Sequence, residues 1–201
     1  MKGVDKLVLF DFDGTITNKD TLFTFTRFAV GDLRFYVGLL LLLIPLVLQK
    51  IKLLSAHKAK EIFLSYFFKG QPLIDFDKTC HQFTKISLTE CIRSQAITTI
   101  KSYQQSGSRI IIVSASPTNW ILPWASSMGI EVIATLLEIN QGKLTGRLSG
   151  KNCNGDEKVQ RIKEHLNLQN FSEIIVYGDS AGDKQMLQLA TKQYYKPFRG
   201  V

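Results

Sequence analysis

The sequence predicts an α/β fold with a mainly parallel sheet, interrupted after its first strand by a helical insertion. Three short apolar runs rich in β-branched residues, 7–10, 109–116 and 173–180, have the composition of buried strands. Apolar residues at roughly helical spacing over 92–106 predict a helix before the second of them. Strands that alternate with helices favour a parallel sheet, and 201 residues suit one domain, or a core with a small insertion.

The second half of the chain continues this alternation. Gly107 predicts that the helix formed by 92–106 ends there, because glycine is common just after the last helical residue. The run 131–139 predicts a further strand, and the turn residues 140–142 connect it to a hairpin partner at 143–148.

Residues 18–90 differ from the rest, since they are rich in Phe and Leu and lack a clear alternation of strands and helices. We interpret them as a helical insertion between two parts of the α/β core, 1–17 and 91–201. Within the insertion, 35–48 contains fourteen residues without a charge. A membrane-spanning helix needs about 20 apolar residues, so this run is short, and Pro45 interrupts it.

The run 35–48 has two interpretations that the sequence leaves open. The first is a buried helix of the insertion. The second is a surface in peripheral contact with a membrane, because basic residues beside an apolar stretch suit an anionic lipid surface. The basic residues near the run are Arg27, Arg34, Lys50, Lys52, Lys58 and Lys60.

The charge balance favours an anionic partner other than nucleic acid. The formal net charge is +8 and the pI is about 9.4, but no run of five basic residues and no zinc-finger spacing occurs. The cysteines Cys80, Cys91 and Cys153 are odd in number and widely spaced, and the sequence starts without a signal-peptide pattern. We therefore expect no nucleic-acid partner, and a cytoplasmic protein that is membrane-associated if 35–48 contacts lipid.

The segment DFDGT follows the first predicted strand and contains two acids, Asp11 and Asp13. Residues two apart in extended chain share a face, so both carboxylates can point into one cleft. Their repulsion requires that the site hold a proton or bind a cation. An EF-hand loop is excluded because Thr15 and Ile16 stand at its fifth and sixth positions, whereas a plain turn stays possible.

The segment GDSAGD after the third strand favours a site for a hard cation. Mg²⁺ takes oxygen ligands and is often held by one or two carboxylates together with substrate phosphate. Asp11 and Asp179 can supply these carboxylates, because ligands bind beyond the carboxyl ends of the strands in such sheets. Asp183, four residues after Asp179, could instead cap a helix that begins near Lys184.

Two further segments favour a phosphate site. In SASP, the Ser114 hydroxyl and nearby backbone N–H groups could hold an anion, or Ser114 could simply cap a helix that starts at Pro117. In NGDEKV, Asn154 and Glu157 resemble a capping box at the start of a helix. Lys158 then lies near a helix N-terminus, where it adds positive charge to a phosphate site unless it is an ordinary surface lysine.

A formal charge count assigns different roles to the paired acids. The four carboxylates carry more charge than one Mg²⁺ and Lys158 can balance, and a phosphate monoester adds about two negative charges. The site therefore works only if one acid keeps its proton. A protonated Asp13 could protonate the leaving oxygen, while ionised Asp11 acts as the nucleophile that forms an aspartyl-phosphate.

The segments DFDGTIT, SAS, GDEKVQR and YGDSAGD, in this order, resemble the motifs of the haloacid dehalogenase superfamily of phosphatases. The resemblance implies a Rossmann-like core with a helical cap inserted after the first motif, Asp11 as nucleophile and Asp13 as general acid/base. Mg²⁺ would be bound by Asp11, the Asp13 main-chain carbonyl and Asp179, with support from Asp183. Substrate phosphate would be bound by Ser114, Lys158, Gly14 and Thr15.

Within the superfamily the chain resembles the subfamily of phosphoserine phosphatases, but Asp20 stands where these usually have Glu, and 50–70 shows no clear counterpart of their cap arginine. The segments NCNGDEKV, YGDSAGDKQM and YYKPFR look closer to a group that includes phosphatidylglycerophosphatase C, which also has an apolar cap segment. The predicted function is a Mg²⁺-dependent phosphatase acting on a lipid phosphate such as phosphatidylglycerophosphate. The alternatives are a phosphatase of a small metabolite such as phosphoserine, a phosphotransferase with the same intermediate, and a non-catalytic membrane-binding module.

Overall fold

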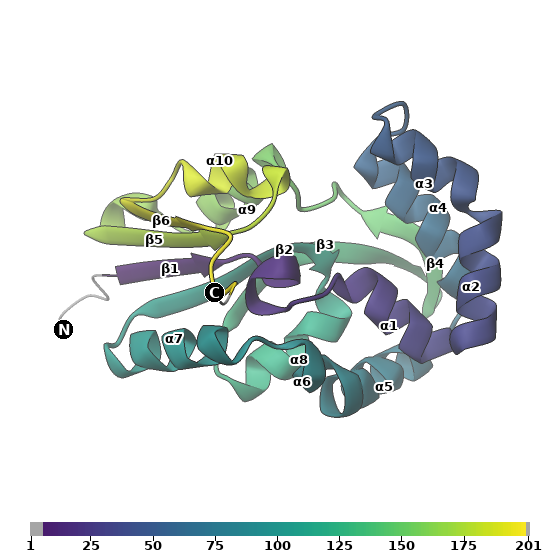
Figure 1. The fold of residues 1–201 in the computed structure, drawn as a ribbon, viewed down its shortest axis with the longest axis horizontal. Coiled ribbons are helices and arrows are strands. Elements are labelled where there is room, and N and C mark those ends of the chain that lie inside the picture. Colours follow the sequence, from purple (N-terminus) through teal and green to yellow (C-terminus); the bar gives the residue numbers. More distant parts are fainter. Residues whose placement is uncertain (1–5, 200–201) are drawn as a thin grey trace.

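The computed structural model describes residues 6–199, which form a six-stranded sheet in the order β4-β3-β2-β1-β5-β6 (Figure 1). Neighbouring strands are parallel except in the β3–β4 hairpin. The strands are β1 Lys6–Phe10, β2 Arg109–Pro117, β3 Glu131–Asn140, β4 Lys143–Ser149, β5 Glu173–Gly178 and β6 Lys192–Tyr195. The predicted α/β fold is therefore confirmed, and short, polar β6 is a strand that the sequence pattern missed.

Helices cover both faces of the sheet because alternate residues of the central strand point in opposite directions. Val8 and Phe10 belong to one apolar core with residues of α7 and α8, whereas Leu7 and Leu9 belong to a second core with residues of α9 and α10. Figure 1 shows these two pairs of helices on opposite sides of β1. Their bounds are α7 Ser94–Gln105, α8 Thr118–Ser127, α9 Asp156–His165 and α10 Lys184–Leu187.

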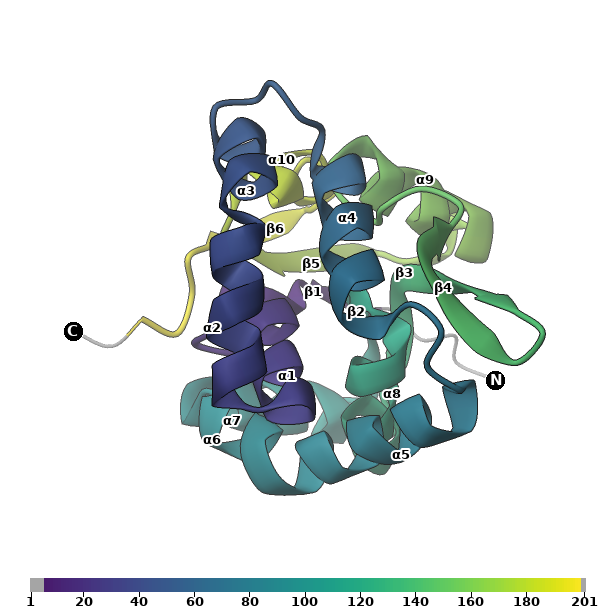
Figure 2. The ribbon, with the colours of Figure 1, turned by 90° about the vertical axis from the view of Figure 1, so that its right-hand side faces the viewer.

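Five helices lie between β1 and the rest of the core, as predicted for the insertion, and Figure 2 shows α2, α3 and α4 beside one another. They are α1 Thr21–Val30, α2 Asp32–Leu41, α3 Leu43–Lys50, α4 Ala56–Phe68 and α5 Leu73–Phe83. The phenylalanines of the insertion pack on one another and on the core: the ring of Phe25 stacks on Trp120 of α8 with 4.5 Å between centroids, and Phe76 and Phe83 contact its edge. The insertion boundaries 18 and 90 stay a prediction, since α5 packs on α8 and on α1, and Phe25 of α1 stacks on Trp120 of α8.

Several short elements complete the fold and correct one expectation. They are the turns Phe12–Ile16 and Thr84–Leu88, the helix α6 Thr89–Cys91 and the 3₁₀ turns Leu168–Asn170 and Ala181–Asp183. The predicted capping box at Asn154 and Glu157 is wrong. Helix α9 begins after Gly155, whose φ of 60° is a turn conformation, and no side chain caps it. Instead, the Glu157 carboxylate accepts a hydrogen bond from Arg161.

The apolar run 35–48 forms α2 and α3, which meet at a bend of 62°. Phe35, Gly38 and Leu42 face inward and are buried, but α3 has no buried residue. The exposed apolar residues on and just after these helices form what we call the α2–α3 apolar face: Leu33, Tyr36, Val37, Leu40, Leu41, Leu43, Ile44, Val47, Ile51 and Leu53. Leu40, Ile44 and Leu53 are more than 70 % exposed, so a fully buried helix is excluded for this run.

Within residues 6–199, no single helix is both long enough and apolar enough to cross a bilayer. Helices α2 and α3 meet those criteria only when they are taken together as a bent pair.

Candidate active site

The predicted acids meet at the carboxyl end of the sheet, in a cavity of about 600 Å³ lined by Asp11, Asp13, Lys158 and Asp179. The register of β1 between β2 and β5 sets this arrangement, since Phe10 pairs with both strands at the same level. The backbone N–H of Asp11 then donates to the Tyr177 carbonyl at 2.9 Å. Parallel strands therefore bring residues far apart in sequence to one edge, as expected for ligand sites in such sheets.

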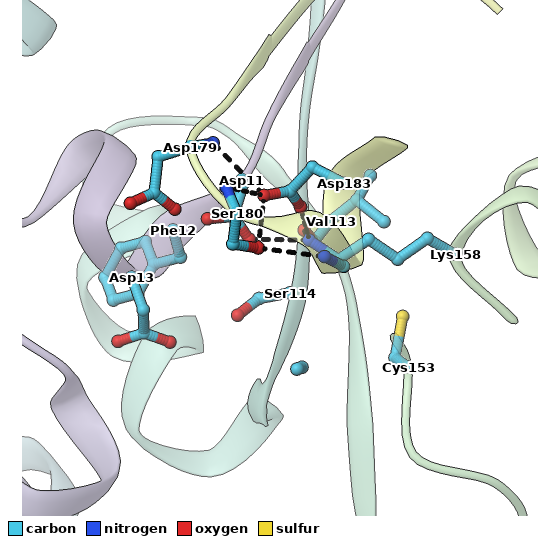
Figure 3. Close-up of polar contacts among 12 residues, drawn as sticks. Asp11, Phe12, Asp13, Val113, Ser114, Cys153, Lys158, Asp179, Ser180 and Asp183 are labelled. Atoms are coloured by element: carbon cyan, nitrogen blue, oxygen red, sulfur yellow. Dashed lines mark hydrogen bonds and ion pairs between the residues drawn. The ribbon is translucent and has the colours of Figure 1, made fainter. Parts of the chain in front are cut away.

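Lys158 is a buried cation rather than a surface lysine, with its side chain 1 % exposed. Its Nζ lies 2.5 Å from Asp11 Oδ1, 2.7 Å from Asp183 Oδ1 and 2.7 Å from the Val113 carbonyl (Figure 3). Burial alone would lower the pKa of Lys158, but the charges of Asp11 and Asp183 outweigh it and hold that pKa well above its usual range. Lys158 thus stays charged at any pH at which an enzyme works.

Asp11 lies at the centre of this charge network and is 5 % exposed. Burial raises the pKa of its carboxyl to about 7 against the opposing attraction of Lys158. A cation that binds beside this buried carboxyl group would therefore stabilise its ionised form.

Asp183 organises the loop after β5. Its Oδ2 accepts hydrogen bonds from the backbone N–H groups of Asp179 and Ser180, at 3.1 and 2.9 Å, and from the Ser180 hydroxyl at 2.8 Å. Burial disfavours its charge, but Lys158 and these donors together lower its pKa. Asp183 also precedes α10, but it makes no side-chain cap to that helix. Its oxygens hold Lys158 and the loop, and this leaves the Asp179 side chain at the wall of the cavity.

Three carboxylates fit a divalent cation. Asp11, Asp179 and Asp183 can each offer one oxygen, and these oxygens lie within 4.8 Å of one another. Burial and the neighbouring charge of Asp183 raise the pKa of Asp179, so added positive charge would be favourable there too. An all-oxygen donor set of this kind suits Mg²⁺.

Asp13 lies on the other side of the cavity and is held by residues of the insertion and of β2. Its Oδ1 accepts the backbone N–H of Thr21 at 2.6 Å, and its Oδ2 accepts the hydroxyl of Ser116 at 2.6 Å. Figure 3 shows the Asp13 carboxylate apart from the Lys158 network, with Ser114 between. The two acids of DFDGT therefore have different surroundings, as their predicted roles require.

The remaining predicted phosphate ligands differ in their access to the cavity. Gly14 lines the cavity. Ser114 and Thr15 are both fully buried, and the Ser114 hydroxyl accepts the backbone N–H of Ser116 at 3.0 Å. Within the part of the chain that the structure describes, the Thr15 hydroxyl has no hydrogen-bond partner. Their contact with phosphate therefore stays a prediction.

Sequence reasoning missed four cations that line this cavity, Lys19, Lys60, Arg93 and Arg199. Lys60 reaches from α4 to the core, where its Nζ donates to the Ala115 carbonyl at 2.7 Å and to Asn152 Oδ1 at 2.8 Å. Burial lowers its pKa to about 8. Arg199 donates to Asp179 Oδ2 at 2.7 Å. Lys60 lies in the segment 50–70 that showed no cap arginine, and nothing in its local sequence distinguishes it from the neighbouring lysines.

We expect Gly14→Ala to lower kcat/KM by about 100-fold, the usual effect of moving a reacting group by about 1 Å. The backbone of Gly14 has a φ of 79°, and a Cβ there would overlap the Asp179 carboxylate. The matched control is Gly129→Ala, which has a φ of 66° but meets no atom within 4 Å. Equal kinetic losses in both variants would contradict this explanation.

Comparisons with known proteins agree with the four motifs. The family model of haloacid dehalogenase-like hydrolases matches residues 8–188. Protein CicA of Caulobacter vibrioides is 31 % identical over 196 residues, which cover 96 % of this chain and 87 % of that protein. Phosphoserine phosphatase of Archaeoglobus fulgidus is 25 % identical over 125 residues, 61 % of this chain and 34 % of that enzyme.

Solved structures show the same fold. A protein of unknown function from Bordetella pertussis superposes with a TM-score of 0.82 at 23 % identity, covering 94 % of this chain and 89 % of that one. A phospho-aspartyl intermediate analogue of phosphoserine phosphatase gives 0.64 at 24 % identity, with 94 % and 85 % covered. The Rossmann-like core and the predicted phosphatase are thereby confirmed: the chain belongs to the haloacid dehalogenase-like hydrolases, in the subfamily similar to phosphoserine phosphatases.

Proposed function

We propose that this enzyme hydrolyses a phosphate monoester through an aspartyl-phosphate formed on Asp11, with Asp13 as general acid/base and Mg²⁺ as cofactor. The observation that carries the proposal is the position of Asp11. It is buried at the wall of the cavity, and its Oδ1 is paired with Lys158 at 2.5 Å. Its Oδ2 accepts no hydrogen bond from the residues that the structure describes, so this oxygen is available to attack.

The reaction proceeds in two displacements at phosphorus. A carboxylate oxygen of Asp11 forms a bond to phosphorus while the bond to the alcohol oxygen breaks, and Asp13 donates its proton to the leaving alcohol. Asp13 then takes a proton from water as that water attacks the aspartyl-phosphate, which releases inorganic phosphate and frees Asp11. Lys158 holds Asp11 in place and offers positive charge to the phosphoryl oxygens.

Mg²⁺, when bound, offsets the negative charge of the transferred phosphoryl group and of the acids around it. The residues that would hold it are Asp11, the main-chain carbonyl of Asp13 and Asp179, with Asp183 in support through the Asp179–Ser180 loop that it fixes.

Binding of Mg²⁺ should stabilise the fold in a pH-dependent way. At about 100 times its Kd, Mg²⁺ should add about 2.7 kcal/mol to the free energy of unfolding, or about 5–10 °C in Tm. Asp11 must lose its proton to bind the cation, and burial raises its pKa to about 7. The rise in Tm should therefore be large at pH 8 and small at pH 5.5. Differential scanning fluorimetry with Asp179→Asn as the ligand-deficient variant tests this, and an undiminished rise in that variant would contradict the site.

For the substrate, the α2–α3 apolar face supports a lipid phosphate such as phosphatidylglycerophosphate. The exposed Lys50 and Lys52 at its end would meet the anionic surface of a membrane, while residues such as Ile44 enter the headgroup region. We infer peripheral membrane contact of a cytoplasmic enzyme through this face. The similarity to phosphoserine phosphatases supports phosphoserine as the second candidate.

Phosphate release with Mg²⁺ tests the proposal, using phosphatidylglycerophosphate in mixed micelles beside phosphoserine and with Asp11→Asn as the blank. Preference for the lipid is the expected result, and preference for phosphoserine would reject the lipid substrate. Added glycerol detects transfer of the phosphoryl group to an alcohol in place of water.

Sedimentation with anionic vesicles tests the membrane contact. Ile44→Glu should weaken this contact. Ile86→Glu, at an exposed isoleucine outside the α2–α3 apolar face, should leave it unchanged.

A further inference from the structure

A second cavity, of about 230 Å³, adjoins the catalytic one between the insertion and the α/β core. The two cavities have wall residues in common, namely Asp20, Leu22, Lys60, Ala115 and Asn154. The inner wall of the second cavity is largely apolar and is formed by Leu22 and Phe23 of α1, Leu46 of α3, and Ala59 and Phe63 of α4. A substrate whose phosphate lies at Asp11 can therefore extend from the acids into an apolar space.

The junction of the two cavities is polar, and Lys60 lies in it. Its ammonium has three N–H groups, of which two are used by the Ala115 carbonyl and Asn152 Oδ1. The third is available to an oxygen atom of a ligand that passes from one cavity to the other. Asp20 also lines the junction, but its carboxylate accepts the backbone N–H of Leu22 at 2.8 Å as the cap of α1.

Helix α3 separates the second cavity from the α2–α3 apolar face. Leu46 and Gln49 of this helix line the cavity, whereas Ile44 and Val47, which point away from it, are exposed. The apolar cavity thus lies directly beneath the surface for which we infer membrane contact. A hydrocarbon chain in this cavity would have apolar surroundings on its way from that surface to the acids.

We propose that this second cavity binds the hydrocarbon part of the substrate alcohol, and that Lys60 binds an oxygen of that alcohol close to the phosphate. The proposal rests on the phosphatase function proposed above and narrows its substrate class. That class is a phosphate monoester whose alcohol has a polar oxygen near the phosphate and an aliphatic chain beyond it. A short, zwitterionic alcohol such as serine would leave the apolar wall without a partner.

Soluble alkyl phosphates test the subsite apart from membrane contact. Ethyl, butyl, hexyl and octyl phosphate are compared below their critical micelle concentrations, with Mg²⁺ present. Each methylene that leaves water should raise kcat/KM about fourfold until the cavity is filled. Leu46→Trp, which fills the cavity, should remove this dependence, so that kcat/KM for octyl phosphate no longer exceeds kcat/KM for ethyl phosphate. Leu48→Trp on the same helix, outside the cavity wall, should retain the dependence.

The outcomes separate the subsite from the proposed function. Phosphate release without chain-length dependence, or an undiminished dependence in Leu46→Trp, overturns the subsite and leaves the phosphatase intact. If no ester is hydrolysed, the proposed function fails, and the subsite is then judged by calorimetry of octyl phosphate. The native chain should bind octyl phosphate at least ten times more tightly than ethyl phosphate, and Leu46→Trp should bind the two equally. Equal affinities in the native chain would overturn the subsite.

The role of Lys60 is tested with a pair of substrates that differ by one oxygen. Lys60→Met should raise KM at least tenfold for an alkyl ether of glycerol phosphate, which has an oxygen near the phosphate, and much less for the alkyl phosphate of equal length. Lys58→Met, an exposed lysine of the same helix, is the control. Equal rises for both substrates would assign Lys60 to holding α4 on the core rather than to the ligand.

Discussion

Asp11→Asn is expected to abolish turnover, with kcat lowered by about 10⁴-fold or more, as when other covalent nucleophiles are removed. The amide keeps the size of the carboxylate but cannot form the acyl phosphate, and no other carboxylate takes its place. Asp13 is held by Thr21 and Ser116 on the far side of the cavity, and both oxygens of Asp183 are engaged by protein donors. Phosphate release under single-turnover conditions measures the effect, with exposed Asp75→Asn as the control.

This variant should fold normally, which makes the kinetic loss interpretable. Because burial raises the pKa of Asp11 to about 7, its ionised form disfavours the fold as pH rises through that value, and a neutral amide avoids this cost. The free energy of unfolding of metal-free Asp11→Asn at pH 8 should therefore equal or exceed that of the native chain. If Asp11→Asn kept its activity, Asp11 would not be the nucleophile. If Asp11→Asn were unfolded, the buried charge of Asp11 would not destabilise the fold as stated.

The sequence predicted those site residues that stand at the ends of strands. Asp11 and Asp179 directly follow predicted strands, and Asp13 comes two residues after Asp11. Because these strands pair in parallel, the meeting of the three acids at one edge of the sheet follows from the fold class alone. Lys158 was predicted from its position near the start of a helix, although the capping box expected there does not form. The predicted strands needed only small corrections at their ends.

The parts that could not be predicted depend on how the insertion packs. Lys60 reaches Ala115 only because α4 packs on β4, which brings together two residues 55 positions apart that no local pattern connects. Ser116, which fixes Asp13, is the second serine of SAS, and spacing alone did not distinguish it from Ser114. The run 35–48 is apolar on every side, so its sequence could not decide which residues are buried.

Lys158→Met is expected to cost both stability and activity. The change leaves Asp11 and Asp183 buried without their cation, and removal of one partner from a buried ion pair typically costs about 3–5 kcal/mol. Loss of a charge that stabilises the transferring phosphoryl group should lower kcat by about 10²- to 10³-fold. Urea unfolding of the metal-free chain measures the first effect, and Lys163→Met, an exposed lysine of the same helix, is the control.

The pH dependence of this variant identifies the cause of its instability. Without Lys158, the folded-state pKa of Asp183 rises above its value in the unfolded chain, and that of Asp11, which burial already raises, rises further. The free energy of unfolding of Lys158→Met should then approach that of the native chain near pH 4 and fall below it progressively as pH rises toward 8. Adding Asp183→Asn to Lys158→Met removes one of the two uncompensated charges. It should restore part of the stability at pH 8 without restoring activity, because the positive charge beside Asp11 is still missing. If the loss in free energy of unfolding did not depend on pH, Lys158 would stabilise the fold through packing of its aliphatic chain. If the double variant recovered activity, Lys158 would act by holding the loop at Asp183 and not by binding the phosphoryl group.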